Sequence, residues 1–197
     1  MSASNSEHHH RRSVRLAGYD YAGPGIYFIT LCTRNRESLF GTVEDGRMCL
    51  NPLGRIVAEE WDRSGIIRPE CAMDEMVVMP NHLHGLVWFR GPADSAGGDA
   101  GWCRGAQPCA PTWPCAPTWT PDANGALFRR PPRSLGAFVA GFKAASTRRI
   151  NTLRESPGNP VWQRNFHEHI VRHERELAAI RRYVRDNPAH WADDPER

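Results

Sequence analysis

A proline-rich segment near the middle of the chain limits what the polypeptide can fold into, because neither a helix nor a central strand can cross it. Residues 91–133 hold 8 of the 16 prolines and 6 of the 17 glycines. Within them the hexapeptide Pro-Cys-Ala-Pro-Thr-Trp occurs twice in succession, at 108–113 and 114–119. Proline removes backbone donors, and few charged or aliphatic side chains are left to pack. We therefore expect a flexible insertion between two halves of one domain.

The chain is long enough for one domain with additional segments. It has 197 residues, and a domain holds about 150 on average. No stretch approaches the roughly 18 apolar residues of a membrane-spanning helix, so we expect a globular protein with no membrane partner. Residues 1–22 are basic and lack the apolar region of a secretory signal, which predicts a disordered tail and a cytoplasmic location. The domain is expected at 23–191, with a C-terminal tail at 192–197.

The cysteines do not form the pattern of a disulfide framework or a zinc site. None stands in a C-x-x-C pair, and three of the six fall in the proline-rich segment. We expect reduced thiols at all six positions, which are Cys32, Cys49, Cys71, Cys103, Cys109 and Cys115.

The rest of the chain alternates between strand-like and helix-like patterns. Strands are predicted at 26–33, 73–79, 82–89 and 161–171, the second and third joined as a hairpin by Pro80 and Asn81. Helices are predicted from Pro52 to about Gly65, from the cap Ser134 to Leu153, and over 174–187 until Pro188 stops the last one. The order β-α-β-β-α-β plus a helix predicts the α+β class. It is that of a ferredoxin-like antiparallel sheet with helices on one face and an additional C-terminal helix.

Positive charge is concentrated in the C-terminal half. Residues 129–185 carry thirteen basic side chains, twelve of them arginine, against four glutamates, a net of +9 where the whole chain has +3. The planar guanidinium suits phosphate oxygens, which favours a polyanionic partner. An arginine-rich solvated face remains the alternative.

The candidate metal ligands are two histidines in the third predicted strand. Residues i and i+2 of a strand point to the same face, so His82 and His84 would project together as half of a metal site. Taken alone, an H-x-H pair is more often a pair of structural histidines than a metal site. The same spacing also occurs at His8/His10 and His167/His169.

The last predicted helix holds Tyr183 and Asn187 four residues apart, on one helical face. A divalent ion on two imidazoles and an amide oxygen can polarise a phosphodiester, and a nearby phenol can attack phosphorus. The alternative is that Tyr183 packs at the rim of the core and Asn187 caps the helix before Pro188.

Four ordered motifs resemble those of the REP-associated tyrosine transposases, which belong to the single-tyrosine HUH transposase superfamily of bacterial insertion sequences. The most distinctive is Val-Val-Met-Pro-Asn-His-Leu-His-Gly-Leu-Val at 77–87, and the others lie at 134–151, 161–172 and 180–188. The resemblance covers 23–191 except the insertion. It implies a nuclease domain in which His82 and His84 match the metal-binding pair and Tyr183 matches the nucleophile. Asn187 stands where relatives place a third metal ligand, often glutamine.

The resemblance also implies an activity and its partners. With Mg²⁺ or Mn²⁺, Tyr183 would attack single-stranded DNA to give a 5′-phosphotyrosine link and a free 3′-OH, which could reseal or transfer the strand in DNA transposition. No nucleotide cofactor is needed. The substrate would be single-stranded or hairpin DNA such as a palindromic repeat, bound in the cytoplasm at the nucleoid by a monomer or homodimer. We expect DNA contacts from Lys143, Arg148, Arg149, Arg164, His169, Arg172 and Arg182.

Two other functions remain open at this point. The first is a DNA-binding regulator that keeps the fold without cleaving, which would form no covalent product with DNA. The second is a metal-dependent phosphohydrolase that uses an activated water and leaves no protein on its product.

Overall fold

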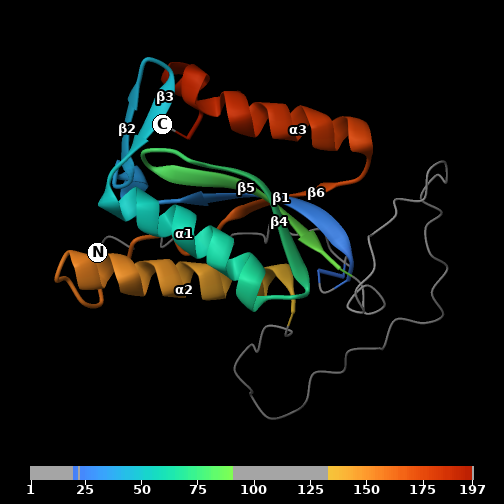
Figure 1. The fold of residues 1–197 in the computed structure, drawn as a ribbon, viewed down its shortest axis with the longest axis horizontal. Helices are drawn as coiled ribbons and strands as arrows, with labels where there is room; N and C mark the ends of the chain where they lie inside the picture. The colour runs from blue at the N-terminus through green and yellow to red at the C-terminus, as the bar shows by residue number, and fades with distance from the viewer. Residues whose placement is uncertain (1–19, 22, 91–132, 197) are drawn as a thin grey trace, which may run out of the picture.

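The computed structural model describes residues 20–21, 23–90 and 133–196 (Figure 1). The expectations for residues 1–19 and for the insertion up to 132, including its three cysteines, lie outside these residues. In the described part, no helix is both long enough and apolar enough to span a membrane. The elements in chain order are β1 (Gly25–Cys32), η1 (Arg34–Arg36), β2 (Gly41–Glu44), β3 (Arg47–Leu50), α1 (Pro52–Ile67), β4 (Cys71–Val78), β5 (His82–Phe89), α2 (Leu135–Leu153), β6 (His167–Val171), α3 (Glu174–Asp186) and η2 (Asn187–Asp193).

The main sheet has four strands in the order β4-β5-β1-β6, and every neighbouring pair is antiparallel. Helices α1 and α2 cover one face of the sheet, and α3 lies across the other (Figure 1). This arrangement confirms the predicted α+β class, the ferredoxin-like sheet and the additional C-terminal helix. Because α3 takes the face opposite to α1 and α2, side chains from both faces of β5 are buried.

Helices α1 and α2 begin at the residues that the sequence predicts, Pro52 and the residue after Ser134. Asn51 caps α1 by accepting hydrogen bonds from the backbone N–H groups of Leu53 and Gly54, and Ser134 caps α2. The core between these helices and the sheet is aromatic, with Trp61 of α1 packed edge-on against Phe138 of α2. A Cβ atom on Gly85 of β5 would lie 2.2 Å from the Trp61 ring, so only glycine fits there.

Two elements differ from the sequence-based expectation. The strand expected over 161–171 is regular only from His167, and in the preceding segment the carbonyl oxygens of Gln163 and Asn165 accept hydrogen bonds from the Lys143 ammonium group instead of from a neighbouring strand. Residues 161–163 still bond to the end of β1, with Gln163 N–H donating to Cys32 O at 2.9 Å. The chain also continues past Pro188 as η2, since proline is compatible with the first turn of a helix.

The hairpin β2–β3 was not predicted. Its strands have four residues each, and Asp45 and Gly46 connect them with positive φ angles of 50° and 70°. Asp-Gly is a strong signal for a two-residue hairpin turn, but the flanking strands are too short and too exposed to show an apolar run.

Candidate active site

The two histidines of β5 point from the sheet toward the α3 side. His82 and His84 are buried, with 0% and 2% of their surface exposed, and their ring centroids lie 4.4 Å apart. Leu83 between them packs into the opposite core, as strand alternation requires. The structure thus brings together the two imidazoles that the sequence places on one face.

One ring nitrogen of each histidine is held by a neighbouring side chain. His82 Nδ1 donates to Asn81 Oδ1 at 2.8 Å, and the Asn81 amide group is oriented by donating from Nδ2 to the Glu196 carbonyl. His84 Nδ1 is hydrogen bonded to Thr30 Oγ1 at 2.9 Å. These bonds fix the ring orientations and leave both Nε2 atoms facing the same space, as is typical of metal-binding histidines.

Burial keeps both imidazoles neutral. Loss of hydration lowers the pKa of His84 to about 3, and the positive charge that a protonated His82 would carry acts in the same direction. The pKa of His82 is also lowered, again chiefly by burial. Near neutral pH each ring therefore presents an unprotonated nitrogen, which is the form that binds a metal ion.

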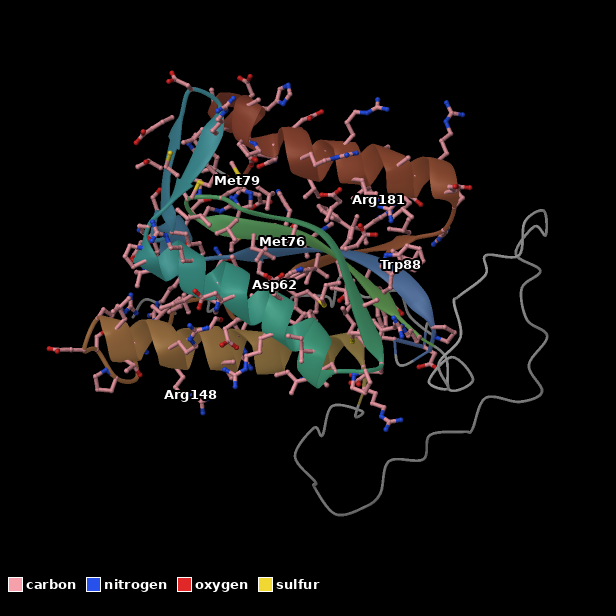
Figure 2. The ribbon with its side chains drawn as sticks, viewed as in Figure 1. Asp62, Met76, Met79, Trp88, Arg148 and Arg181 are labelled. Atoms are coloured by element: carbon pink, nitrogen blue, oxygen red, sulfur yellow. The ribbon has the colours of Figure 1, made fainter. Side chains whose placement is uncertain are left out.

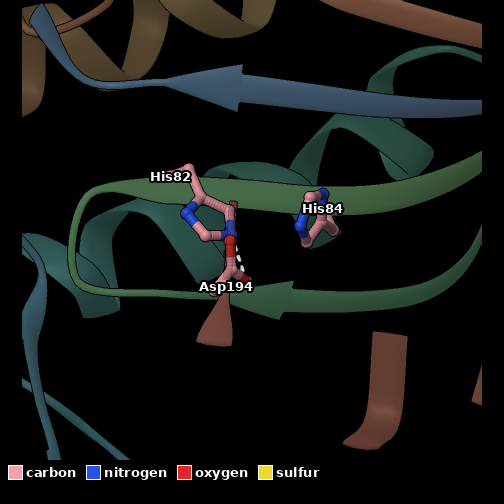
Figure 3. A group of neighbouring side chains, drawn as sticks. All are labelled: His82, His84 and Asp194. Atoms are coloured by element: carbon pink, nitrogen blue, oxygen red, sulfur yellow. Dashed lines mark ion pairs between the residues drawn. The ribbon is translucent and has the colours of Figure 1, made fainter. Parts of the chain in front are cut away.

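A carboxylate that the sequence analysis did not identify completes the cluster. Asp194, which follows η2, is buried, and its Oδ2 lies 3.8 Å from His82 Nε2 (Figure 3). The potential ligand atoms of His82, His84 and Asp194 all lie within 4.8 Å of one another. Two imidazoles and one carboxylate form a donor set that suits a divalent metal ion.

Two buried polar atoms indicate that this cluster fits a metal. Among the described residues, His82 Nε2 and Asn187 Oδ1 are buried without a hydrogen-bond partner. Buried polar atoms are normally paired, and both are good ligand atoms. The residues present therefore fit a divalent cation, and His82, His84 and Asp194 could hold it.

Asn187 lies in the site, but its observed contact is with the carboxylate. Its Nδ2 donates to Asp194 Oδ2 at 2.9 Å, and its side chain is buried. The residue thus orients Asp194, while its unpartnered Oδ1 leaves a role as a further ligand open. Asp194 belongs to the segment 192–197 that the sequence suggested as a tail.

Tyr183 of α3 is directly beside the histidine pair. Its hydroxyl group lies 3.3 Å from His84 Nε2 and its side chain remains 43% exposed. Burial and the negative charges of Asp194 and Glu196 raise its pKa above the usual value. The phenol is therefore protonated at neutral pH, and a cation in the cluster would make it easier to ionise.

An ion pair to β4 fixes the helix that carries Tyr183. The Arg181 guanidinium contacts both carboxylate oxygens of Asp74, and Trp88 Nε1 also donates to this carboxylate at 2.7 Å. Burial alone would raise the pKa of Asp74, but these hydrogen bonds hold it below the ordinary value. Asp74 stands at the irregularity between Met73 and Met76 where β4 departs from β5. Tyr183, two residues after Arg181, is thereby held over the sheet.

The predicted DNA-contacting residues fall into three groups. Lys143, Arg148 and Arg164 line one cavity beside α2. Arg149 and His169 are already paired, Arg149 with Glu59 and Glu60 of α1 and His169 with Glu176. The other two side chains are exposed, with Arg172 just before α3 and Arg182 within that helix.

Comparisons with known proteins give a sequence relative and solved structures that are similar. No protein-family model matches the chain. An uncharacterized protein of Haemophilus influenzae strain Rd is 35% identical over 190 residues, which cover 96% of this chain and 94% of the relative. A solved REP-associated tyrosine transposase bound to a REP hairpin matches with a TM-score of 0.52 at 15% identity, over 90% of this chain and 78% of that one. This match shows a shared fold and supports the resemblance seen in the sequence.

A second solved structure matches more loosely. A Deinococcus radiodurans protein described as a putative transposase has a TM-score of 0.38 at 18% identity, over 87% of this chain and 95% of that one. A similarity at this level adds nothing to the fold comparison.

Proposed function

Because the chain belongs to the same family as the Haemophilus influenzae protein and has the fold of a REP-associated tyrosine transposase, we propose that it is a transposase-like enzyme. It cuts and rejoins single-stranded DNA with Tyr183 as the nucleophile and a divalent metal at the His82–His84–Asp194 cluster. The observation that carries this proposal is the Tyr183 hydroxyl group, 3.3 Å from His84 Nε2 at the edge of the cluster.

The chemistry follows from what these side chains can do. The Tyr183 oxygen attacks the phosphorus of a phosphodiester, and the bond from phosphorus to the 3′ oxygen breaks. The phenol loses its proton to water through its exposed side, and the departing oxygen takes up a proton to become a free 3′-OH. The 5′ end is left as a phosphotyrosine. When bound, Mg²⁺ or Mn²⁺ supplies positive charge that stabilises the developing charge on the phosphate oxygens.

Rejoining uses the same atoms in reverse. A 3′-OH from the same or another strand attacks the phosphotyrosine, a new phosphodiester forms, and Tyr183 is released. The energy of the original bond is kept in the covalent link, so no nucleotide cofactor is required. His82, His84 and Asn187 stay in place throughout because each is buried and held by neighbouring side chains.

The proposed substrate is hairpin DNA from a palindromic repeat. The solved transposase with this fold is bound to a REP hairpin, and the basic surface of this chain suits a polyanion. We propose that the protein acts on such DNA as a monomer or homodimer.

Incubation with labelled hairpin oligonucleotides and Mn²⁺, followed by a denaturing gel, tests the proposal. The expected product is a labelled band that migrates with the protein and disappears after proteolysis. A non-cleaving DNA-binding regulator would leave the oligonucleotide intact. A phosphohydrolase that uses water would shorten it without any protein attached.

A further inference from the structure

A cavity of about 820 Å³ lies between the C-terminal half of α2 and the segment that leads to β6. Sites for small ligands commonly measure about 300–1,000 Å³. Trp162 and Asn151, which line it, are buried, whereas Arg148 and Arg164 are exposed. Figure 2 shows Arg148 extending from α2 away from the sheet. The cavity is separate from the metal cluster, which lies on the α3 side of the sheet.

The walls of this cavity are held in place by side-chain hydrogen bonds. Trp162 Nε1 donates to Ser146 Oγ at 2.9 Å, and Asn151 Nδ2 donates to the Asn159 carbonyl at 2.7 Å. Lys143 Nζ donates to the carbonyls of Gln163 and Asn165. Because these bonds join α2 to the following segment, the cavity is preformed.

The charge around the cavity favours an anion. Lys143, Arg148 and Arg164 line it against the single acidic residue Glu155. Neither Arg148 nor Arg164 forms an ion pair with another residue in the part of the chain that the structure describes. Arg149, the residue after Arg148 on α2, differs because two glutamates of α1 neutralise its charge. Two uncompensated guanidinium groups therefore remain for phosphate oxygens.

The cavity lies at the same end of the sheet as His82. Cys32 of β1 pairs with His82 on one side, and its carbonyl accepts the N–H of Gln163 on the other. Neighbouring strands lie about 4.8 Å apart, so the Gln163 backbone is roughly 10 Å from that of His82. Arg164 follows Gln163 at this edge. The cavity and the metal cluster therefore lie toward the same end of the sheet, on opposite faces.

We propose that this cavity binds one unstacked nucleotide of the single-stranded DNA that Tyr183 attacks, an inference that rests on the proposed function. The base enters beside Trp162, and Arg148 and Arg164 contact the flanking phosphates. A duplex is too wide to enter a cavity of this volume, whereas a single nucleotide fits.

Salt-dependent binding of a short fluorescent oligothymidylate, measured by anisotropy in EDTA, tests the site without requiring cleavage. The variants Arg148→Ala and Arg164→Ala should each weaken binding several-fold. Each should reduce the slope of log affinity against log salt by about 0.7, the value for one phosphate contact on single-stranded DNA. Arg55→Ala, an exposed arginine on α1, is the matched control and should keep the wild-type slope. Unchanged slopes for Arg148→Ala and Arg164→Ala would overturn the proposal.

Filling the cavity gives a second readout that does not depend on charge. Thr147 lines the cavity from α2, and Thr147→Trp should abolish oligothymidylate binding while the melting temperature stays near that of the wild type. Wild-type affinity in a folded Thr147→Trp protein would show that the cavity is not the site.

The two proposals fail separately. Wild-type protein that forms a covalent adduct, together with cavity variants that bind normally, would remove the nucleotide site and keep the nuclease. Cavity variants that lose binding, in a protein that never forms an adduct, would keep the nucleotide site and remove the nuclease.

Discussion

Asn187 donates a hydrogen bond from Nδ2 to Oδ2 of Asp194 at 2.9 Å, and this contact sets the carboxylate beside the histidine pair. The same oxygen lies 3.8 Å from His82 Nε2. The residue that the sequence suggested as a ligand thus also positions a better one, since a carboxylate binds a divalent cation more strongly than an amide oxygen does.

This relationship predicts different effects for two substitutions. Asp194→Ala removes a charged ligand and should abolish measurable Mn²⁺ binding. Asn187→Ala leaves His82, His84 and Asp194 present but releases the carboxylate, and loss of such an orienting partner typically costs about 10–100-fold in metal affinity. Calorimetric titration with Mn²⁺ compares the two. A larger loss for Asn187→Ala than for Asp194→Ala would make the amide the principal ligand.

The two H-x-H pairs of the described strands should behave differently. His82→Ala or His84→Ala should eliminate Mn²⁺-dependent cleavage, because each removes a buried nitrogen from the cluster. His169→Ala is the matched control on β6, where the imidazole is partly exposed and paired with Glu176. It should retain metal binding. Mn²⁺ affinity retained in His82→Ala and lost in His169→Ala would place the metal on the other strand.

The metal-free protein should become less stable as the solution is acidified. In the unfolded chain the pKa of both histidines returns to about 6.5, whereas burial holds the folded value for His84 at about 3 and lowers that for His82. Between these values the unfolded state binds more protons. The free energy of unfolding therefore falls as pH drops below about 6.5, by up to about 1.4 kcal/mol per pH unit for each imidazole.

Urea unfolding in EDTA across this pH range provides the measurement. The double variant His82→Gln/His84→Gln should show a shallower pH dependence than the wild type, because neither replacement side chain takes up a proton. Equal slopes for the two proteins would show that these imidazoles are not the source of acid sensitivity.

The contact between Arg181 and Asp74 should stabilise α3 on the sheet. Arg181→Met removes three hydrogen bonds to a partly buried carboxylate, and we expect the free energy of unfolding to fall by about 1–2 kcal/mol. Arg182→Met, at the next and exposed position, should change it by less than about 0.5 kcal/mol. Chemical denaturation of the wild type and the two variants measures these changes in the free energy of unfolding. A fall of equal size in both would assign the effect to general charge loss.

Much of the fold could be predicted because its signals are local. Strand alternation, Pro52 at the start of α1 and the cap Ser134 identified the main elements, and their order alone indicated the ferredoxin-like sheet. The same alternation placed His82 and His84 on one face of β5. The helical spacing of Tyr183 and Asn187 likewise put both on the side of α3 that faces the cluster.

The remaining features depend on contacts between distant parts of the chain. Asp194 reaches His82 only because η2 continues beyond Pro188 and returns toward β5, and no local pattern encodes that path. Arg148 and Arg149 are equivalent in the sequence. In the structure, two glutamates of α1 form ion pairs with Arg149 and none does so with Arg148. Such differences arise from the packing of one helix against another.

The central claim is that the Tyr183 oxygen becomes covalently linked to DNA. Wild-type protein incubated with a labelled hairpin oligonucleotide and Mn²⁺ should give an adduct, and mass spectrometry should locate the nucleotide on the peptide that contains Tyr183. Tyr183→Phe should form no adduct while it binds the oligonucleotide in EDTA as tightly as the wild type, because only the nucleophilic oxygen is lost. An undiminished adduct in Tyr183→Phe, or a nucleotide attached to another residue, would contradict the account.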